Sequence, residues 1–192
     1  DIQGYTLMRL AGDGPGTGAI VEIGSFMGRS TCYLALGTQS TQREKVYAID
    51  HFQGSPEHQR GADCEIEVLV KTGSTFPQFL QNIKKMGVED YVHPIQAASR
   101  EAAAEWNQPI RLLFIDGDHS YEASKEDFEL WERHVVPGGL IAFHDIGDWP
   151  GVTRYYKELV SSTTEYREVL GVIGLRIIEK VPPLRPAPLS ML

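Results

Sequence analysis

Residues 19–28 read AIVEIGSFMG, and this stretch decides the fold. Its first five residues are apolar apart from Glu22, so they predict a short buried β-strand that ends at Gly24. Residues 30–36 then have the composition of a helix. Gly24 allows a sharp backbone turn, and Gly28 allows the backbone to approach a ligand closely. These glycines are spaced differently from the G-x-G-x-x-G loop that binds dinucleotides.

The same strand-then-helix order continues along the chain. Further strands are predicted at 46–49, 91–95, 110–115 and 140–143. Helices are predicted at 75–86, 99–106, 121–135 and 152–160. Such alternation is typical of a parallel sheet covered on both faces. The last two strands, 166–172 and 175–179, are joined by a connection so short that only an antiparallel hairpin allows it. We therefore predict an α/β fold, with a doubly wound, mostly parallel, seven-stranded sheet and an antiparallel last strand.

The pattern forms one domain over residues 1–181. Residues 52–75 are polar with little periodicity, and we expect them to form a lid over the site, as long loops in compact domains often do. Residues 182–192 are rich in proline, which cannot continue a sheet. We expect them to form an extended tail or an arm on a partner subunit.

Composition narrows the classes of function. The 192 residues carry a formal net charge of −8, which disfavours general binding to nucleic acid because phosphate backbones are repelled. No run reaches the roughly 18 apolar residues that a membrane helix needs, so no membrane partner is expected. Cys32 and Cys64 have no metal-like spacing and are typical of a reduced interior. We expect a cytoplasmic enzyme.

Polar residues follow the predicted parallel strands where each strand ends. In open α/β sheets ligands bind beyond these carboxyl ends, so the side chains are expected to converge on one site. They are Glu22, Asp50, His51, Ser99, Asp116, Asp118, His119, His144 and Asp145. Asp50 is placed to accept hydrogen bonds from both hydroxyls of a ribose. Together with the loop at Gly24, it predicts a nucleoside-type cofactor.

Three segments carry a resemblance to a known family. They read VEIGSFMGRST at 21–31, FIDGDHSYE at 114–122 and PGGLIAFHD at 137–145. Together they resemble the signature segments of class I S-adenosylmethionine-dependent methyltransferases. The particular resemblance is to bacterial small-molecule O-methyltransferases with an IDGDHSY motif, and it covers nearly the whole chain. It implies a Rossmann-like fold, S-adenosylmethionine as cofactor and a small-molecule acceptor.

The resemblance also implies which residues bind the cofactor. The methionine end would be lined by Glu22, Gly24, Ser25 and Gly28, with Arg29, Ser30 and Thr31 opening the adjoining helix. Ser30 and Thr31 have an alternative role as caps of that helix. Asp50 would hold the ribose, and His51 would lie beside it. The adenine would be bordered by Ala98 and Ser99.

A metal site is implied at Asp116, His144 and Asp145, and Asp116 also belongs to the cofactor site. Related metal-dependent O-methyltransferases carry an acid at the first position and an acid–acid or acid–amide pair at the second, so His144 departs from the pattern. Imidazole with two carboxylates still suits a divalent ion, with Mg²⁺ first and Mn²⁺ or Fe²⁺ as alternatives. The ion would lower the pKa of the acceptor hydroxyl. Alternatively, His144 and Asp145 are hydrogen-bonding residues at a strand end, with no metal.

His119 and Asp118 are the candidates for general base. An unperturbed histidine, with a pKa of about 6.5, accepts a hydroxyl proton at neutral pH. His119 has an alternative role as a cap of the helix that starts near Tyr121. Asp118 also has an alternative role, in which it accepts a hydrogen bond from the amino group of the cofactor. Trp149 and Tyr155 or Tyr156 are candidates for an apolar wall around an aromatic or sugar acceptor, although core packing is the more frequent role of such residues.

We therefore predict methyl transfer from S-adenosylmethionine to an oxygen of a small molecule, with a nitrogen acceptor left open. One alternative is a nicotinamide-dependent Rossmann oxidoreductase, which explains Gly24 and Asp50 but not the spacing of the loop or the acids and histidine at 116–119. Another is a non-catalytic cofactor-binding domain. A homodimer is common for such domains by analogy.

Overall fold

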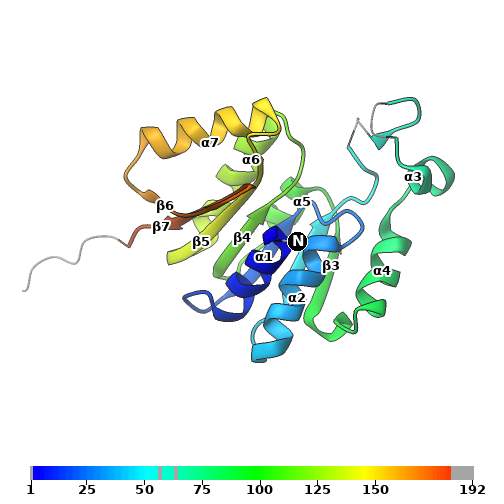
Figure 1. Cartoon of the computed structure of the whole chain (residues 1–192), viewed down its shortest axis with the longest axis horizontal. Helices are drawn as coiled ribbons and strands as arrows, with labels where there is room; N and C mark the ends of the chain where they lie inside the picture. The colour runs from blue at the N-terminus through cyan, green and yellow to red at the C-terminus, as the bar shows by residue number, and fades with distance from the viewer. Residues whose placement is uncertain (1, 56–57, 63–64, 183–192) are drawn as a thin grey trace, which may run out of the picture.

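A computed structural model describes residues 2–55, 58–62 and 65–182. Its centre is a seven-stranded sheet in the order β3-β2-β1-β4-β5-β7-β6 (Figure 1). The strands are β1 (Ala19–Ile23), β2 (Val46–Asp50), β3 (Val92–Gln96), β4 (Ile110–Ile115), β5 (Val135–Ile146), β6 (Tyr166–Val172) and β7 (Gly174–Lys180). The first five strands pair in parallel, whereas β7 is antiparallel to both β5 and β6. The predicted fold is confirmed: the reversed strand is β7, the last in the chain, and it lies between β5 and β6.

The sheet is covered on both faces because its central strands are apolar on both sides. In β1, Ile20 packs into one core cluster and Val21 into the other. The cluster of Ile20 includes side chains of α1 (Ile2–Asp13), α2 (Arg29–Thr41) and α4 (Phe76–Lys85). The cluster of Val21 includes side chains of α5 (Ser99–Glu105), α6 (Tyr121–Trp131) and α7 (Pro150–Ser162). The two helical layers thus leave the carboxyl ends of the parallel strands accessible.

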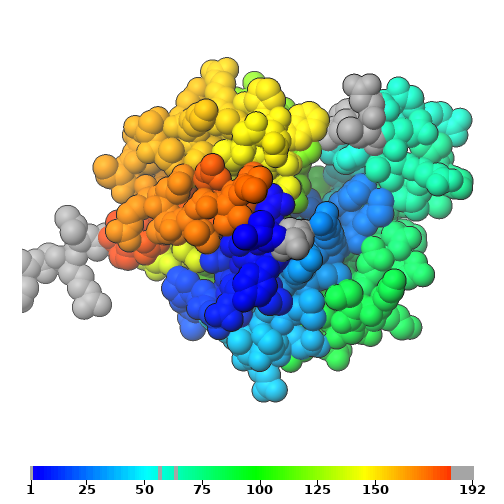
Figure 2. All heavy atoms as spheres, in the orientation of Figure 1, coloured from blue at the N-terminus to red at the C-terminus, as the bar shows by residue number. Residues whose placement is uncertain are grey.

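The N-terminal helix α1 is an element that the sequence pattern does not predict. It packs closely on α2 because Gly37 has no side chain: a Cβ there would lie 2.1 Å from the carbonyl oxygen of Met8. Near the start of α1, Gln3 donates a hydrogen bond to the carbonyl oxygen of Ile173. This contact places α1 beside the β6–β7 hairpin, where the blue and orange segments meet (Figure 2).

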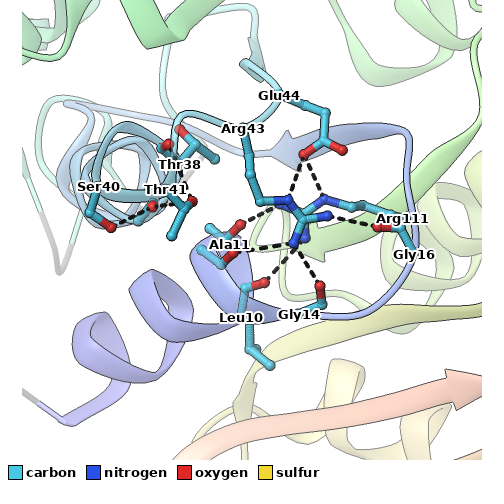
Figure 3. Close-up of polar contacts among 12 residues, drawn as sticks. Leu10, Ala11, Gly14, Gly16, Thr38, Ser40, Thr41, Arg43, Glu44 and Arg111 are labelled. Carbon is cyan, nitrogen blue, oxygen red and sulfur yellow. Dashed lines mark hydrogen bonds and ion pairs between the residues drawn. The ribbon is translucent and has the colours of Figure 1, made fainter.

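Two arginines from outside α1 hold its C-terminal end (Figure 3). Arg111 of β4 is 1% exposed, donates hydrogen bonds to the carbonyl oxygens of Leu10 and Ala11, and pairs with Glu44 at 3.0 Å. Arg43 donates to the carbonyl oxygens of residues 12, 14 and 16. The last carbonyl groups of a helix lack partners within the helix and carry partial negative charge, so the guanidinium groups stabilise this end.

The region before β5 differs from the prediction. The helix predicted over 121–135 ends at Trp131, and β5 begins at residue 135 instead of 140. The register of β5 against β4 shifts between Ile110 and Leu112, so β5 bulges at residues 136–139. Pro137, Gly138 and Gly139 suggest a break between a helix and a strand, but a bulged strand also accommodates them.

The predicted lid contains a short helix, α3 (Glu67–Thr72). At the start of the lid, Phe52 is fully buried and packs against Phe76 and Phe79, with ring centroids 4.8 Å and 5.1 Å away. Leu69 of α3 is also buried. The segment is therefore anchored by apolar packing, and its role as a lid stays a prediction.

Two sequence-based expectations concern residues outside the described ranges. The first concerns Cys64, and the second concerns the proline-rich tail from residue 183 onward. Cys32 is a buried free thiol. Within the described ranges, no helix is long and apolar enough to cross a membrane.

Candidate active site

Two adjoining cavities open at the carboxyl ends of the parallel strands. The larger, of about 430 Å³, is lined by the loops that follow β1, β2, β3, β4 and β5. The smaller, of about 260 Å³, lies between α1, the β1 loop and the start of α2. Gly24, Phe26, Asp116 and His144 line both cavities and form the wall between them. We call these four residues the shared wall.

Most of the predicted site residues line these cavities. The larger cavity is lined by Gly24, Asp50, His51, Ser99, Asp116, Asp118, His119, His144 and Asp145. Ser25 and Ser30 line the smaller cavity. Glu22, Gly28 and Thr31 line neither of the two, and Glu22 and Thr31 are completely buried. The structure therefore brings most of the predicted residues to one place. Glu22 and Thr31 lie buried behind the cavity wall.

The loop after β1 turns at Gly24, whose φ is +86°. A Cβ at this position would lie 2.1 Å from the backbone oxygen of Asp116, so only glycine allows the ends of β1 and β4 to approach this closely. Asp50 fixes the same loop from β2. Its carboxylate accepts hydrogen bonds from the backbone N–H groups of Phe26 at 2.7 Å and Phe52 at 2.5 Å. Asp50, which is predicted to bind the ribose, thus also joins the β1 loop to the lid.

Behind the β1 loop, the carboxyl group of Glu22 is completely buried. Thr31 donates a hydrogen bond to it, and the hydroxyl groups of Ser30 and Ser25 also interact with it. Burial raises the pKa of Glu22 to about 7, and the three hydroxyl groups oppose this effect. The N-cap of α2 is Gly28, without a capping side chain. Thr31 therefore binds Glu22 instead of capping the helix.

Glu22→Gln is expected to stabilise the protein at high pH. A carboxyl group with a pKa of about 7 when folded and 4.5 in its ordinary state binds its proton more tightly in the folded protein. Stability therefore falls as the pH rises from 4.5 towards 7. The neutral amide avoids this loss, so the free energy of unfolding should rise by about 1–3 kcal/mol at alkaline pH and by much less under acidic conditions.

Urea unfolding at pH values on either side of this range measures the difference. Glu89→Gln, at an exposed position before β3, is the matched control and should show no comparable dependence on pH. An equal change in stability for Glu22→Gln at both pH values would mean that the pKa of Glu22 is not raised by folding.

Asp116, His144 and Asp145 meet at the shared wall. Nδ1 of His144 lies 2.9 Å from Oδ1 of Asp116 and 3.1 Å from Oδ1 of Asp145. Burial alone would lower the pKa of His144, but its interactions with the two carboxylates raise it to about 10. Burial raises the pKa of Asp116. The pKa of Asp145 lies well below its usual range, because His119 and His144 outweigh the effect of burial.

The same three residues fit a divalent metal ion. Each offers one ligand atom, and these atoms lie within 4.8 Å of one another. Neighbouring ligands of an octahedral ion with bonds of about 2.1 Å are about 3 Å apart, which matches the two separations from His144. Carboxylates suit Mg²⁺ and Mn²⁺, and imidazole suits Fe²⁺. Only neutral imidazole is a ligand, so binding of the ion would release the proton of His144.

His119 extends the cluster. Its Nε2 lies 2.8 Å from Oδ2 of Asp145, and its ring stacks on Trp149 with centroids 4.5 Å apart. The N-cap of α6 is Ser120, whose hydroxyl makes the capping hydrogen bond, so His119 does not cap this helix. Asp118 accepts a hydrogen bond from the backbone N–H of Ser120 at 2.7 Å. Asp118 therefore stabilises the turn before α6, while His119 is held by a carboxylate.

Two titratable residues of the larger cavity are not identified by the sequence analysis. His58 of the lid stacks on Phe26, with ring centroids 4.9 Å apart. Asp127 of α6 is 8% exposed, and burial raises its pKa to about 6 against the opposing effect of a hydrogen bond with Ser99. A signal for Asp127 exists in the sequence, because it is an acid next to Phe128 on the apolar face of a helix, where a carboxylate needs a partner.

Comparisons with known proteins show the family to which this chain belongs. A family model described as a methyltransferase domain matches residues 21–146. The uncharacterized protein R132 of Acanthamoeba polyphaga mimivirus is 30% identical over 131 residues, which cover 67% of this chain and 52% of that protein. The uncharacterized protein y4gI of Sinorhizobium fredii is 28% identical over 176 residues, which cover 86% of this chain and 18% of that protein. The chain thus spans about half of the first relative and less than a fifth of the second.

Solved structures share the fold at low identity. The O-methyltransferase NovP matches with a TM-score of 0.73 and 15% identity, over 93% of this chain and 79% of that chain. An O-methyltransferase from Bacillus cereus in complex with SAH matches with a TM-score of 0.63 and 19% identity, over 93% of this chain and 81% of that chain. The family match, from residue 21 in β1 to the end of β5, includes every strand end that lines the cavities. This chain is therefore a member of the methyltransferase domain family.

Proposed function

We propose that this protein transfers a methyl group from S-adenosylmethionine to a hydroxyl oxygen of a small molecule. The observation that carries the proposal is the cluster of Asp116, His144, Asp145 and His119, two of which belong to the shared wall. A cofactor that spans both cavities would bring its reactive centre to this wall, next to groups that can move a proton.

The proposed cofactor fits the arrangement of the two cavities. Its adenosine would occupy the larger cavity, with the ribose hydroxyls at Asp50. Its methionine would occupy the smaller cavity, beside Ser25 and Ser30. The sulfonium would then lie near Gly24 and Asp116 of the shared wall. The SAH in the Bacillus cereus structure and the description of NovP as an O-methyltransferase support this choice of cofactor and acceptor atom.

Methyl transfer is an in-line displacement. The acceptor oxygen forms a bond to the methyl carbon while the carbon–sulfur bond breaks, S-adenosylhomocysteine leaves, and the hydroxyl proton passes to a base. The protein accelerates this step chiefly by aligning the acceptor with the sulfonium and excluding water. We assign the proton to His119, because the carboxylate of Asp145 at 2.8 Å orients the imidazole and stabilises its protonated form.

A divalent ion would be held by Asp116, His144 and Asp145. Such an ion, when bound, would lower the pKa of an acceptor hydroxyl. Asp145 would then contact both the ion and His119, because its Oδ1 faces His144 and its Oδ2 lies 2.8 Å from Nε2 of His119. The base and the ion site would therefore be joined by a single carboxylate.

Asp50→Ala is expected to weaken binding of S-adenosylmethionine by about 1–3 kcal/mol. The variant loses the hydrogen bonds to the ribose and the tie to the β1 loop. Calorimetric titration with S-adenosylmethionine, run with Mg²⁺ and again with EDTA, measures the affinity. Asp90→Ala, an exposed position before β3 and away from the cavities, is the control. Unchanged affinity in Asp50→Ala would remove this residue from the cofactor site.

The same titration of the unsubstituted protein tests the proposed function. Micromolar binding of S-adenosylmethionine is expected, followed by release of S-adenosylhomocysteine with a suitable hydroxylated acceptor. Binding of NADH without binding of S-adenosylmethionine would favour the nicotinamide-dependent oxidoreductase. Cofactor binding without turnover across a broad acceptor panel would favour a non-catalytic domain.

A further inference from the structure

A further cavity, of about 630 Å³, lies between α6 and α7, outside the candidate active site (Figure 1). We call it the α6–α7 cavity. Its volume is within the range of small-molecule sites, and none of its lining residues lines either cavity at the strand ends. Helix α6 separates the sites, because Ala123 and Asp127 line the larger active-site cavity whereas Lys125 and Glu129 line this one. A ligand here would bind apart from the proposed methyl transfer.

Buried aromatic side chains form the base of the α6–α7 cavity. Phe128, Tyr155 and Tyr166 all line it and are all less than 9% exposed. The ring centroid of Phe128 lies 5.9 Å from that of Tyr155 and 5.2 Å from that of Tyr166. The hydroxyl of Tyr166 donates a hydrogen bond to Glu132 at 2.7 Å. This base offers apolar surface to a ligand, such as the carbon chain of an amine.

The hydroxyl of Tyr155 makes no hydrogen bond with any residue that the structure describes. Tyr155 is 6% exposed, and it lines this cavity instead of the acceptor site for which its sequence position made it a candidate. Burial raises the pKa of the hydroxyl, and the charge of Glu129 raises it further, so the group stays protonated. Since Glu129 also lines the cavity, the hydroxyl lies at the cavity end of the ring. A buried hydroxyl without a partner is costly, and a protonated phenol can still accept a hydrogen bond from a ligand.

The rim of the cavity carries an excess of negative charge. Four acids and one lysine line it, namely Glu129, Glu132, Glu158, Glu165 and Lys125. Lys180 pairs with the acid at 132 at 2.8 Å, and Arg154 pairs with the acid at 158 at 2.9 Å. Lys125 lies 3.7 Å from Glu129, and Glu165 is exposed, with no ion pair to a described residue. Two carboxylates therefore remain for a cationic ligand.

Arg154 shows that this surface attracts a cation. Its guanidinium lies over the ring of Tyr121, 4.7 Å from the ring centroid, and it pairs with Glu158. Tyr121 and Glu158 both line the cavity. An aromatic face and a carboxylate thus already hold a positive group at the edge of the site.

We propose that the α6–α7 cavity binds a linear aliphatic amine that carries two or more ammonium groups. Its carbon chain would pack on the aromatic base, and one ammonium group would donate hydrogen bonds to the hydroxyl of Tyr155 and to Glu129. A second ammonium group would pair with Glu165. Binding of the amine does not depend on the proposed methyl transfer.

Calorimetric titration with diaminooctane, which has an amino group at each end, tests the proposal. The octanediol of the same length is the matched neutral probe. The unsubstituted protein should bind one diamine at least about tenfold more tightly than the diol, because the ammonium groups make charge-assisted hydrogen bonds. Higher salt should weaken binding of the diamine, since the carboxylates of the rim are screened. Equal affinity for the two compounds, or no saturable binding of the diamine, would overturn the proposal.

Tyr155→Phe removes the hydroxyl and keeps the ring, and affinity for the diamine should fall about tenfold. No described residue loses a hydrogen bond, so thermal unfolding should show a folded protein. Tyr156→Phe is the matched control, because the neighbouring hydroxyl donates to Glu168 and Tyr156 does not line the cavity. It should keep full affinity for the diamine. Equal affinity in folded Tyr155→Phe and in the unsubstituted protein would refute the site.

Glu165→Gln tests the charge at an exposed position, where the substitution does not endanger folding. Affinity for the diamine should fall about two- to fivefold at low salt. Glu89→Gln, exposed before β3 and away from the cavity, makes the same change in net charge and should leave the affinity unchanged. An equal loss in both variants would mean that only the overall negative charge attracts the amine, which overturns the proposal. This comparison decides the question if Tyr155→Phe does not fold.

Discussion

Asp145→Asn is expected to lower turnover by about 10²–10⁴-fold while leaving the affinity for S-adenosylmethionine largely unchanged. Asp145 contacts both histidines of the cluster, His119 at 2.8 Å and His144 at 3.1 Å. The substitution removes the charge that stabilises His119 in its protonated form. Asparagine also tolerates the left-handed backbone of residue 145, whose φ is +60°, so backbone strain does not explain the loss.

Release of S-adenosylhomocysteine across a panel of phenols, sugars, alcohols and amines measures the turnover, and calorimetry measures cofactor binding. Asp148→Asn, at an exposed position in the next turn, is the matched control and should keep full turnover. If the unsubstituted protein responds to Mg²⁺, Mn²⁺ or EDTA, this response should be lost in Asp145→Asn. Turnover that survives both the substitution and chelation would contradict the role assigned to Asp145.

The strands could be predicted where a short apolar run is followed by a turn residue or an acid. The predictions for 19–23 and 110–115 coincide with β1 and β4, because both strands are buried on two faces and read as continuous apolar runs. The β6–β7 hairpin follows from its short connection, which allows only an antiparallel pair.

Helix α1 could not be predicted in the same way. It contains Gly4 and Gly12, and glycine lowers helix propensity. Its C-terminal end is held by Arg111, which donates to the carbonyl oxygen of Leu10 across 101 positions in the sequence. A contact between residues so far apart leaves no trace in the local pattern from which helices are predicted.

The place of the site could be predicted, but most of its contacts could not. Parallel strands share one direction, so Asp50 and Asp116 were expected at the same edge of the sheet. The contacts of Asp50 depend on the backbone at Phe26 and Phe52, where φ is +47° and +59°. Asp127 lies in a helix rather than at a strand end, and it reaches the cavity only because α6 packs against α5 and the sheet.

Gly24→Ala is expected to abolish measurable cofactor binding and to lower the free energy of unfolding by about 2–5 kcal/mol. The φ of +86° at this position costs an L-residue about 1–2 kcal/mol. A Cβ would also lie 2.1 Å from the backbone oxygen of Asp116, so the ends of β1 and β4 would have to separate. This overpacking adds about 1–3 kcal/mol. The displacement falls at the shared wall, where we propose that the sulfonium lies.

Gly87→Ala separates the two causes of this effect. Gly87 has a φ of +66°, but nothing lies within 4 Å of a Cβ added there, so only the backbone strain applies. Its stability should fall by about 1–2 kcal/mol, with unchanged cofactor affinity. Urea unfolding and calorimetric titration of both variants measure the difference. If Gly24→Ala lost no more stability than Gly87→Ala and still bound S-adenosylmethionine, the close contact of β1 with β4 would not be required for the fold or for cofactor binding.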